Sequence, residues 1–209
     1  MTKVKICGIT NIEDARRSIA YGADMLGFNF YPKSPRYVLP TDAQRIGAGI
    51  PGDVAKIGVF VSEDVEKIAA TVRAANLDGV QLHGDESPEF VRKLRRVIDC
   101  NVIKAFRVSD DFVAEQTLQY EVDGVLLDGF APGLAGGTGE TFDWNVARDV
   151  SELGLKLYLA GGLSADNVQA AIRIVRPFAV DACSLLESRA GTKDDEKLRR
   201  FIMEAKRDD

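Results

Sequence analysis

Short runs of β-prone residues recur along the whole chain, separated by stretches whose apolar residues have helical spacing. The runs begin near Val4, Met25, Lys56, Gly79, Val102, Gly124, Lys156 and Ala179, at intervals of 21 to 32 residues. Serine or threonine opens several of the helical stretches, as helix-capping residues do: Thr41, Ser62, Ser87, Ser164 and Thr192. Strands that alternate with helices are typical of βαβ units. The pattern therefore predicts an α/β protein, a (β/α)8 TIM barrel of parallel strands that forms a single domain over residues 1–209.

Apolar and other side chains alternate along several of these strands, so the two sets point to opposite faces. Val80 and Leu82, for example, alternate with Gln81 and His83. We expect the apolar set to face the helices and the other set to line the barrel interior and its mouth. The predicted interior set includes Lys5, Cys7, Asn29, Gln81, His83, Asp128 and Asp181. Ionisable groups inside a barrel are costly unless they are paired or functional, so these positions are candidates for a site.

The first strand, residues 4–7, ends in a cysteine and leads directly into a predicted helix. Residues 10–13 have the T-x-x-E pattern of a capping box, with Thr10 as the capping residue. Cys7 therefore lies at a strand tip, and barrel active sites lie at the carboxyl ends of the strands. Lys5 shares the face of Cys7, and a nearby ammonium favours the thiolate, the form that acts as base or nucleophile. The alternative interpretation is a small buried cysteine that only packs.

Composition and charge exclude several classes of function. Hydrophobic residues make up 45% of the chain, which is ordinary for a globular protein with a sizeable core. No segment approaches the roughly 18 uninterrupted apolar residues of a membrane span, and no signal peptide is recognisable. The net charge of −5 and the lack of a basic run argue against nucleic acid as a partner. We therefore expect a protein that acts on neither membranes nor nucleic acids.

The cysteine and histidine content bears on metals and on the cellular compartment. Three cysteines at unrelated spacings argue against a disulfide framework or a zinc site and fit a reducing compartment, so we expect a cytoplasmic protein. Cys100 precedes the fifth strand, at the end opposite the site, and we expect it to be inert. The single histidine, His83, rules out a multi-histidine metal site, and no carboxylate cluster suggests magnesium. We therefore predict no metal.

Two strand ends carry groups suited to proton transfer. Cys7 ends the first strand and Asp128 the sixth, so the two lie across the barrel mouth from each other. A base and an acid in this arrangement can move protons on a substrate without a cofactor. The alternative for Asp128, which precedes Gly129, is a structural cap of the following loop.

The loops after the seventh and eighth strands have features of a phosphate site. Gly161 and Gly162 end the seventh strand, and Ser164 follows as a predicted helix start. Glycines let backbone amides approach a phosphate, and a helix N-terminus adds a favourable dipole. Asp181, Cys183 and Ser184, at the end of the eighth strand, border the same place, and we expect Asp181 to bind the substrate. Barrels frequently bind phosphate with these two loops, although simple turn chemistry explains a glycine pair equally well.

Two strand-to-helix loops are longer than the others, residues 29–40 and residues 128–144. Long loops at this end of a barrel form binding sites or lids, and tolerated insertions are the alternative. Arg36 lies in the first loop, where a guanidinium suits two-point recognition of a carboxylate or phosphate; a solvated surface arginine is the alternative. For His83 we predict a binding role rather than the leading catalytic one.

With these segments together, the chain resembles the phosphoribosylanthranilate isomerases, barrel enzymes of tryptophan biosynthesis. The likeness covers nearly the whole chain through KICGIT, GFNFYPKSPRYV, IGVFV, VQLHGDE, VLLD, GGTGETFDW and LAGGL, in that order. The resemblance implies an Amadori rearrangement of N-(5-phosphoribosyl)anthranilate to the 1-deoxyribulose 5-phosphate form. It implies no metal or organic cofactor and a small phosphorylated substrate as the partner, and it leaves monomer and homodimer undecided.

The resemblance also assigns roles to residues. Asp128 matches the general acid that protonates the furanose ring oxygen, and Cys7 matches the general base that removes the proton from sugar C2. Arg36 matches the residue that holds the anthranilate carboxylate. Gly161, Gly162 and the turn after Asp181, which includes Ser184, match the phosphate site.

Two positions depart from the pattern of the family. Strand eight usually continues as D-x-S-S-G-V-E, whereas residues 181–187 read DACSLLE, so Leu185 replaces a glycine and restricts the approach of backbone to phosphate. Gly129 follows Asp128 where threonine or serine is common. Neither departure removes a proposed catalytic group.

Two other functions stay open at this point. One is a related phosphosugar isomerase of histidine biosynthesis, which typically has an aspartate where this chain has Cys7. The other is a catalytically silent barrel that acts as a binding module. The presence of both Cys7 and Asp128 argues against a silent barrel, since function must be inferred from the site rather than from the fold.

Overall fold

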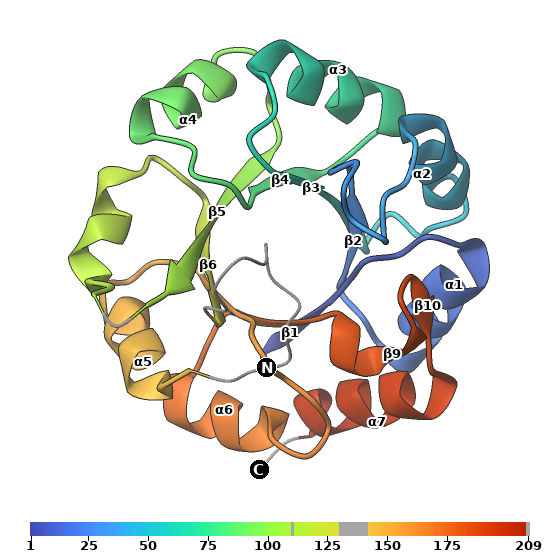
Figure 1. The fold of residues 1–209 in the computed structure, drawn as a ribbon. Helices are drawn as coiled ribbons and strands as arrows, with labels where there is room; N and C mark the ends of the chain where they lie inside the picture. The colour runs from blue at the N-terminus through green and yellow to red at the C-terminus, as the bar shows by residue number, and fades with distance from the viewer. Residues whose placement is uncertain (110, 130–141, 208–209) are drawn as a thin grey trace.

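Eight parallel strands close into a barrel in which each strand pairs with the next and the last pairs with the first (Figure 1). The structure, a computed structural model, describes residues 1–109, 111–129 and 142–207. The strands are β1 (Lys3–Cys7), β2 (Met25–Asn29), β3 (Ala55–Phe60), β4 (Gly79–Leu82), β5 (Asn101–Val108), β6 (Gly124–Gly129), β7 (Leu157–Leu159) and β8 (Ala179–Ala182). Each begins within one residue of its predicted start. The predicted (β/α)8 barrel is confirmed.

A ring of helices surrounds the barrel (Figure 1). They are α1 (Ile12–Tyr21), α2 (Pro40–Gly47), α3 (Val65–Ala75), α4 (Pro88–Arg95), α5 (Trp144–Glu152), α6 (Val168–Val175) and α7 (Asp195–Lys206). Across the described ranges, none of these helices is long and apolar enough to cross a membrane.

The connection between β5 and β6 contains a short 3-10 helix, η1 (Ala114–Gln119), where an α-helix was expected. The hydroxyl of Thr117 donates to the carbonyl of Ala114 at 2.7 Å, three residues earlier. Such a local bond competes with regular α-helical geometry and accompanies the tighter turn. The prediction of an α-helix after every strand is therefore wrong for the fifth unit.

The predicted helix starts are right for α4 and shifted for the other helices. Ser87 caps α4, since its hydroxyl accepts from the Phe90 N–H at 3.2 Å. Thr10 does not cap α1: Asn11 does, by accepting from the Asp14 N–H at 2.8 Å. The caps of α2, α3, α6 and α7 are Leu39, Asp64, Asn167 and Asp194 instead of Thr41, Ser62, Ser164 and Thr192. Of these four residues only Asp194 accepts a capping hydrogen bond with its side chain, so at α2, α3 and α6 the start is set without a side-chain cap.

The core has two layers, as the alternation along the strands predicts. Apolar residues such as Val80 and Leu82 point outward and join the inner faces of the helices in one continuous cluster. A smaller apolar cluster fills the barrel interior: Met25, Ile57, Ile103, Ala105, Leu126, Tyr158, Ala160 and Ala179. Interior positions nearer the carboxyl ends of the strands are polar and buried, among them Lys5, Asp128 and Asp181.

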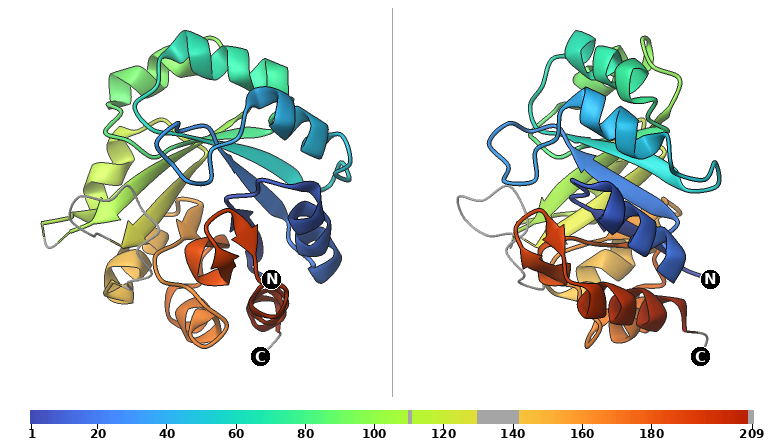
Figure 2. Two further views of the ribbon diagram at one scale, coloured as in Figure 1. Left: turned by 45° about the vertical axis from the view of Figure 1, so that its right-hand side comes forward. Right: turned by 90° about the vertical axis from the view of Figure 1, so that its right-hand side faces the viewer.

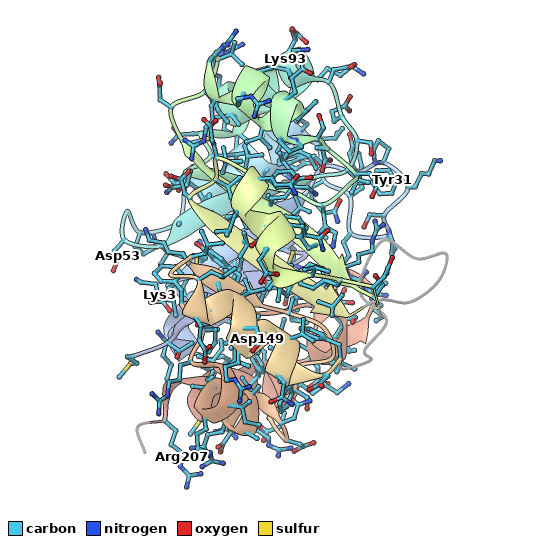
Figure 3. The ribbon with its side chains drawn as sticks, turned by 90° about the vertical axis from the view of Figure 1, so that its left-hand side faces the viewer. Lys3, Tyr31, Asp53, Lys93, Asp149 and Arg207 are labelled. Carbon is cyan, nitrogen blue, oxygen red and sulfur yellow. The ribbon has the colours of Figure 1, made fainter. Side chains whose placement is uncertain are left out.

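The two ends of the barrel are distinct in a side view (Figure 3). Tyr31, just after β2, lies at one end, whereas Lys3, which begins β1, and Asp53, which precedes β3, lie at the other. The end near Tyr31 is the carboxyl end of the strands, which we call the mouth. Cys100 directly precedes β5 and therefore lies at the opposite end, as predicted.

The last elements of the chain return to the first. A hairpin of β9 (Glu187–Arg189) and β10 (Thr192–Lys193) follows β8, and α7 packs beside α1 (Figure 2). The backbone N–H of Lys193 donates to the Asp14 carboxylate at 2.8 Å, and the Thr10 hydroxyl donates to the Gly191 carbonyl. These bonds hold the hairpin against the start of α1.

Substitution of Leu94 on α4 tests the apolar layer between the barrel and the helices. Its side chain is fully buried against the barrel, so Leu94→Ala is expected to lower the free energy of unfolding by about 2–5 kcal/mol. The matched control is Leu118→Ala in η1, where the side chain is 54% exposed and the change should stay within about 0.5 kcal/mol. Urea unfolding followed by circular dichroism measures both, and equal effects would contradict the assignment of the layer.

Candidate active site

Cys7 occupies the last position of β1 and is almost entirely buried. Its register partner in β2 is Gly27. A methyl group on Gly27 would lie 2.8 Å from the Cys7 sulfur and 3.1 Å from Lys5 Nζ. The glycine therefore leaves the space that the thiol and the ammonium occupy, and Cys7 stands at the strand tip as predicted.

Lys5 is a fully buried cation two residues before Cys7. Its Nζ lies 3.0 Å from Oδ1 of Asp181, in an ion pair that joins the first and last strands. Burial lowers the pKa of Lys5, but the charges of Asp181 and Cys7 outweigh burial and raise it. Burial raises the pKa of Asp181 to about 7, because the charge of Lys5 offsets only part of the desolvation. Asp181, predicted to bind substrate, thus has an ammonium of the chain as its partner.

A second thiol adjoins Cys7. Cys183 directly follows β8, and its sulfur lies 3.9 Å from Glu187 Oε1 and 3.9 Å from Lys193 Nζ. The neighbouring thiol of Cys183 lowers the pKa of Cys7 well below its ordinary value, and the cations Lys5 and Lys193 act in the same direction against the effect of burial. The contact with Cys7 and burial raise the pKa of Cys183. The pair therefore keeps the proton on Cys183 and favours the thiolate at Cys7.

Arg36, in the loop after β2, makes a two-point contact with a carboxylate of the chain itself. Its Nε and Nη2 donate to the two carboxylate oxygens of Glu187 at 2.9 and 2.7 Å. These hydrogen bonds raise the pKa of Arg36 despite its burial. Lys193 Nζ lies 3.2 Å from Glu187 Oε1 and donates to the Cys183 carbonyl at 3.2 Å. Nη1 of Arg36 takes no part in the pair with Glu187, and the Arg36 side chain is 17% exposed.

Asp128, next to last in β6, is paired with the single histidine. Its Oδ2 lies 3.4 Å from Nε2 of His83. Nε2 of Gln81 lies 2.9 Å from Nδ1 of His83. The Gln81 amide thus holds one ring nitrogen of His83, and the other ring nitrogen, Nε2, lies toward Asp128. His83 is thus placed to support the predicted acid.

The turn after β7 packs directly on the end of β6. Gly161 and Gly162 have left-handed backbone, with φ of 81° and 62°. A side chain on Gly161 would come within 2.5 Å of the Gly129 nitrogen, so this contact requires a glycine whatever ligand binds. The Ser164 N–H donates to Oδ1 of Asn167, and Nδ2 of Asn167 donates to the Gly162 carbonyl, each at 2.8 Å. These bonds fix the turn before α6.

Ser184 begins η2 (Ser184–Leu186), the short 3-10 helix that follows β8. A helix of this length has a small dipole, so a phosphate there would depend on hydrogen bonds from individual groups. Leu185, which stands where the family has a glycine, points its side chain partly to solvent.

The predicted residues gather into two groups at the mouth. Cys7, Asp181 and Arg36 belong to the group around β1 and β8. His83 and Asp128 belong to the group around β4 and β6. The two groups interact through charge: His83 lowers the pKa of Cys7, and Asp128 raises the pKa of Asp181. Both effects are smaller than those of the residues that contact Cys7 and Asp181 within their own group. The long loop predicted after Asp128 lies, for residues 130–141, outside the described residues.

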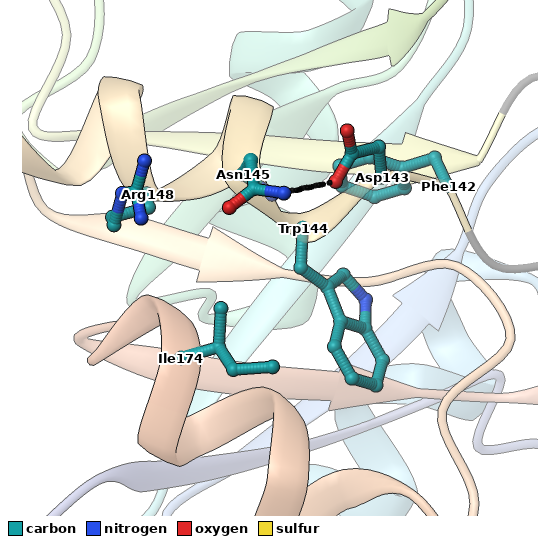
Figure 4. Close-up of a pocket in the computed structure, with 6 residues that line it drawn as sticks. All are labelled: Phe142, Asp143, Trp144, Asn145, Arg148 and Ile174. Carbon is teal, nitrogen blue, oxygen red and sulfur yellow. Dashed lines mark hydrogen bonds between the residues drawn. The ribbon is translucent and has the colours of Figure 1, made fainter.

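A pocket elsewhere in the molecule does not coincide with these groups. It lies between α5 and α6 and is lined by Phe142, Asp143, Trp144, Asn145, Arg148 and Ile174 (Figure 4). None of the predicted site residues lines it, so the mouth of the barrel is the better candidate. Within the described residues, no group of three or more His, Cys, Asp or Glu side chains could hold a metal ion.

The geometry can be compared with known proteins. The family described as "N-(5'phosphoribosyl)anthranilate (PRA) isomerase" matches residues 4–204. The chain belongs to the PRA isomerase family. PRA isomerases are enzymes of tryptophan biosynthesis, which agrees with the resemblance of the sequence segments.

Individual PRA isomerases match over their whole length. The enzyme of Trichlorobacter lovleyi is 47% identical over 206 residues, which cover 99% of this chain and 98% of the relative. The crystal structure of the Thermotoga maritima enzyme is 45% identical and superimposes with a TM-score of 0.91, covering 99% of each chain. Another PRA isomerase structure, 44% identical with a TM-score of 0.87 and 99% coverage of each chain, contains reduced 1-(o-carboxyphenylamino)-1-deoxyribulose 5-phosphate.

Sequence analysis missed three features of this PRA isomerase site. It did not place Cys183 beside Cys7, although a closed barrel sets the first strand beside the last. The register pairs Ile6 with Ala182, and a cysteine comes next after each of these residues. It also missed the ion pair between Arg36 and Glu187. The third feature is Lys193, which contacts both Glu187 and the Cys183 carbonyl. No sequence pattern signals Lys193, which reaches the site from β10.

Lys5→Met is expected to raise the pH at which Cys7 reacts with iodoacetamide, because loss of the buried cation destabilises the thiolate. The alkylation rate of the peptide that contains Cys7, followed by mass spectrometry across pH, measures the effect. Lys3→Met is the control, since Lys3 lies in the same strand with its side chain 50% exposed at the opposite end. An unchanged profile in Lys5→Met would exclude this role of the lysine.

Proposed function

We propose that this chain converts N-(5-phosphoribosyl)anthranilate to 1-(2-carboxyphenylamino)-1-deoxyribulose 5-phosphate, with Asp128 as general acid and Cys7 as general base. The observation that carries the proposal is the buried Cys7 thiol, which Cys183 and two lysines favour as thiolate, at the same barrel mouth as the Asp128 carboxyl. Membership in the PRA isomerase family supports the substrate. So does the related structure that contains the reduced product.

Ring opening is the first step. The Asp128 carboxyl gives its proton to the furanose ring oxygen, and the bond between that oxygen and C1 breaks. The lone pair of the anthranilate nitrogen forms the C1=N bond of an open-chain Schiff base. The ring of His83, whose Nε2 lies 3.4 Å from Asp128 Oδ2, stabilises the carboxylate that this step leaves.

Proton removal from C2 is the second step. The Cys7 thiolate takes this proton, the C–H electrons form a C1=C2 double bond, and the electrons of the C=N bond return to nitrogen. The resulting enolamine then gains a proton at C1 and loses one from the C2 hydroxyl, which gives the ketone. A thiolate whose pKa is lowered is available as base at neutral pH, and Lys5 compensates its charge in a buried site.

The two anionic ends of the substrate account for the remaining residues. Arg36 binds the anthranilate carboxylate through the part of its guanidinium that Glu187 does not occupy, while Glu187 holds the guanidinium plane in place. The turn with Gly161 and Gly162 and the Ser184 region bind the phosphate. His83 and Asp181 border the reacting sugar.

Cys7→Ala and Asp128→Asn are each expected to lower kcat by ~10²- to 10⁴-fold, because each removes one proton-transfer group. Loss of anthranilate fluorescence on freshly made substrate measures turnover. Cys100→Ala is the control, since it makes the same change at the opposite end of the barrel and should leave the rate unchanged. Absence of turnover by the folded unmodified protein would overturn the proposed function, and the substrate of the related histidine-pathway isomerase is assayed in parallel.

Arg36→Lys is expected to raise KM by roughly tenfold, equivalent to about 1.4 kcal/mol, with a smaller effect on kcat. A lysine cannot make the two-point contact with Glu187, and it lacks the further guanidinium N–H groups that would bind the substrate carboxylate. Arg45→Lys, on the exposed surface of α2, is the control. If kcat fell while KM stayed the same, Arg36 would have a role in the chemical steps instead of in binding.

A further inference from the structure

Cys7 and Cys183 occupy equivalent places on neighbouring strands. β1 and β8 pair in parallel, with Lys5 opposite Asp181 and Ile6 opposite Ala182. The next residue in β1 is Cys7, and the residue that directly follows β8 is Cys183. Neighbouring strands lie about 4.8 Å apart. A disulfide requires Cα atoms about 4.4–6.8 Å apart, so the register brings the two backbones within disulfide range.

The two thiols also act on each other. Cys183 lowers the pKa of Cys7, and Cys7 raises the pKa of Cys183. A methyl group on Gly8 would lie 2.8 Å from the Cys183 sulfur, so this sulfur lies against the residue that directly follows Cys7. A methyl group on Gly27, in β2, would lie 2.8 Å from the Cys7 sulfur. The Cys183 sulfur therefore lies beside the end of the strand that carries Cys7.

Their electrostatic surroundings give the two thiols different roles. The neighbouring thiol of Cys183, the cations Lys5 and Lys193 and the charge of His83 lower the pKa of Cys7 against the effect of burial and favour a thiolate there. Cys183 keeps its proton, and Lys193 Nζ lies 3.9 Å from its sulfur. The thiolate is the form that attacks an oxidant, and a neighbouring thiol is what resolves the first oxidation product.

We propose that Cys7 and Cys183 form a redox modification site that takes hydrogen peroxide as its oxidant and closes to a disulfide across β1 and β8. The Cys7 sulfur attacks one peroxide oxygen, the O–O bond breaks, and the departing hydroxide takes a proton to become water. The product is a sulfenic acid on Cys7. The Cys183 sulfur then gives up its proton and attacks the Cys7 sulfur, the S–O bond breaks, and a second water leaves. Two thiols supply the two electrons that reduce one peroxide.

The disulfide would control the activity, and this consequence rests on the proposed function of Cys7 as base. A sulfur held in a disulfide cannot accept the C2 proton, so the oxidised protein is inactive until a dithiol reduces it. Cys183 also protects the base, since a sulfenic acid without a resolving thiol is oxidised further to an irreversible sulfinic acid. Cys100 lies at the opposite end of the barrel and takes no part, because burial raises its pKa.

The test treats the whole protein with a small excess of hydrogen peroxide and follows intact mass, peptide mass and turnover. The unmodified protein is expected to become lighter by two hydrogen atoms, to yield a cross-linked peptide containing Cys7 and Cys183, and to lose at least ~10²-fold in activity. Dithiothreitol is expected to restore the mass and the activity. Cys100→Ser should behave in the same way.

Cys183→Ser separates a disulfide from simple oxidation. This variant is expected to gain the mass of two oxygen atoms on Cys7 and to lose its own starting activity in a way that dithiothreitol does not reverse. If the unmodified protein also accumulated sulfinic acid on Cys7 without a cross-linked peptide, the proposal would be overturned. The mass readout needs no substrate, so a disulfide that forms in a protein without isomerase activity would contradict the proposed function and leave the modification site in place.

Discussion

The mouth of the barrel depends on one buried charge, the ammonium of Lys5. Removing a charge from water is costly, and the cost is met only when anionic partners surround it at close range. Asp181 provides one partner at 3.0 Å, and the Cys7 thiolate provides the other negative charge nearby. Since these partners come from β8 and β1, the same ammonium stabilises the closure of the ring and the reactive form of the thiol. The position of the Lys5 ammonium therefore affects both the stability of the barrel and the reactivity of Cys7.

Charges of alternating sign continue from this interior pair to the surface loop. Past the two thiols, Lys193 approaches Glu187, and Glu187 in turn holds Arg36. Each buried charge in the series has an opposite charge within contact distance, so none of them is left to destabilise the fold alone. The arrangement also couples Arg36, the residue proposed to bind the substrate carboxylate, to the hairpin that follows β8. A change at either end of the series alters the charge that the next member experiences.

The sequence determines the strands more clearly than the helix starts. Runs of β-branched and apolar residues are distinctive, and each strand begins within one residue of its prediction. Helix starts depend on competition between adjacent caps, as with Thr10 and Asn11, and one hydroxyl bond from Thr117 accompanies a 3-10 helix in place of an α-helix. The positions of Cys7 and Asp128 near strand ends could be predicted because a strand end is a local property of the sequence. The contacts of Lys193 could not, because they depend on how a hairpin folds back onto the barrel.

The closure of the barrel by its first and last strands also has a consequence for synthesis. Lys5 and Asp181 are 176 residues apart, and ribosomes add about 5–20 residues per second, so roughly 9–35 s separate the two on a nascent chain. Cys7 and Lys5 are among the first residues to leave the ribosome, but Asp181, Cys183 and Lys193 are among the last to be made. A chain truncated before β8 would keep Cys7 beside Lys5 but would lack the carboxylate that pairs with Lys5 and the thiol and ammonium of Cys183 and Lys193 that lower the pKa of Cys7.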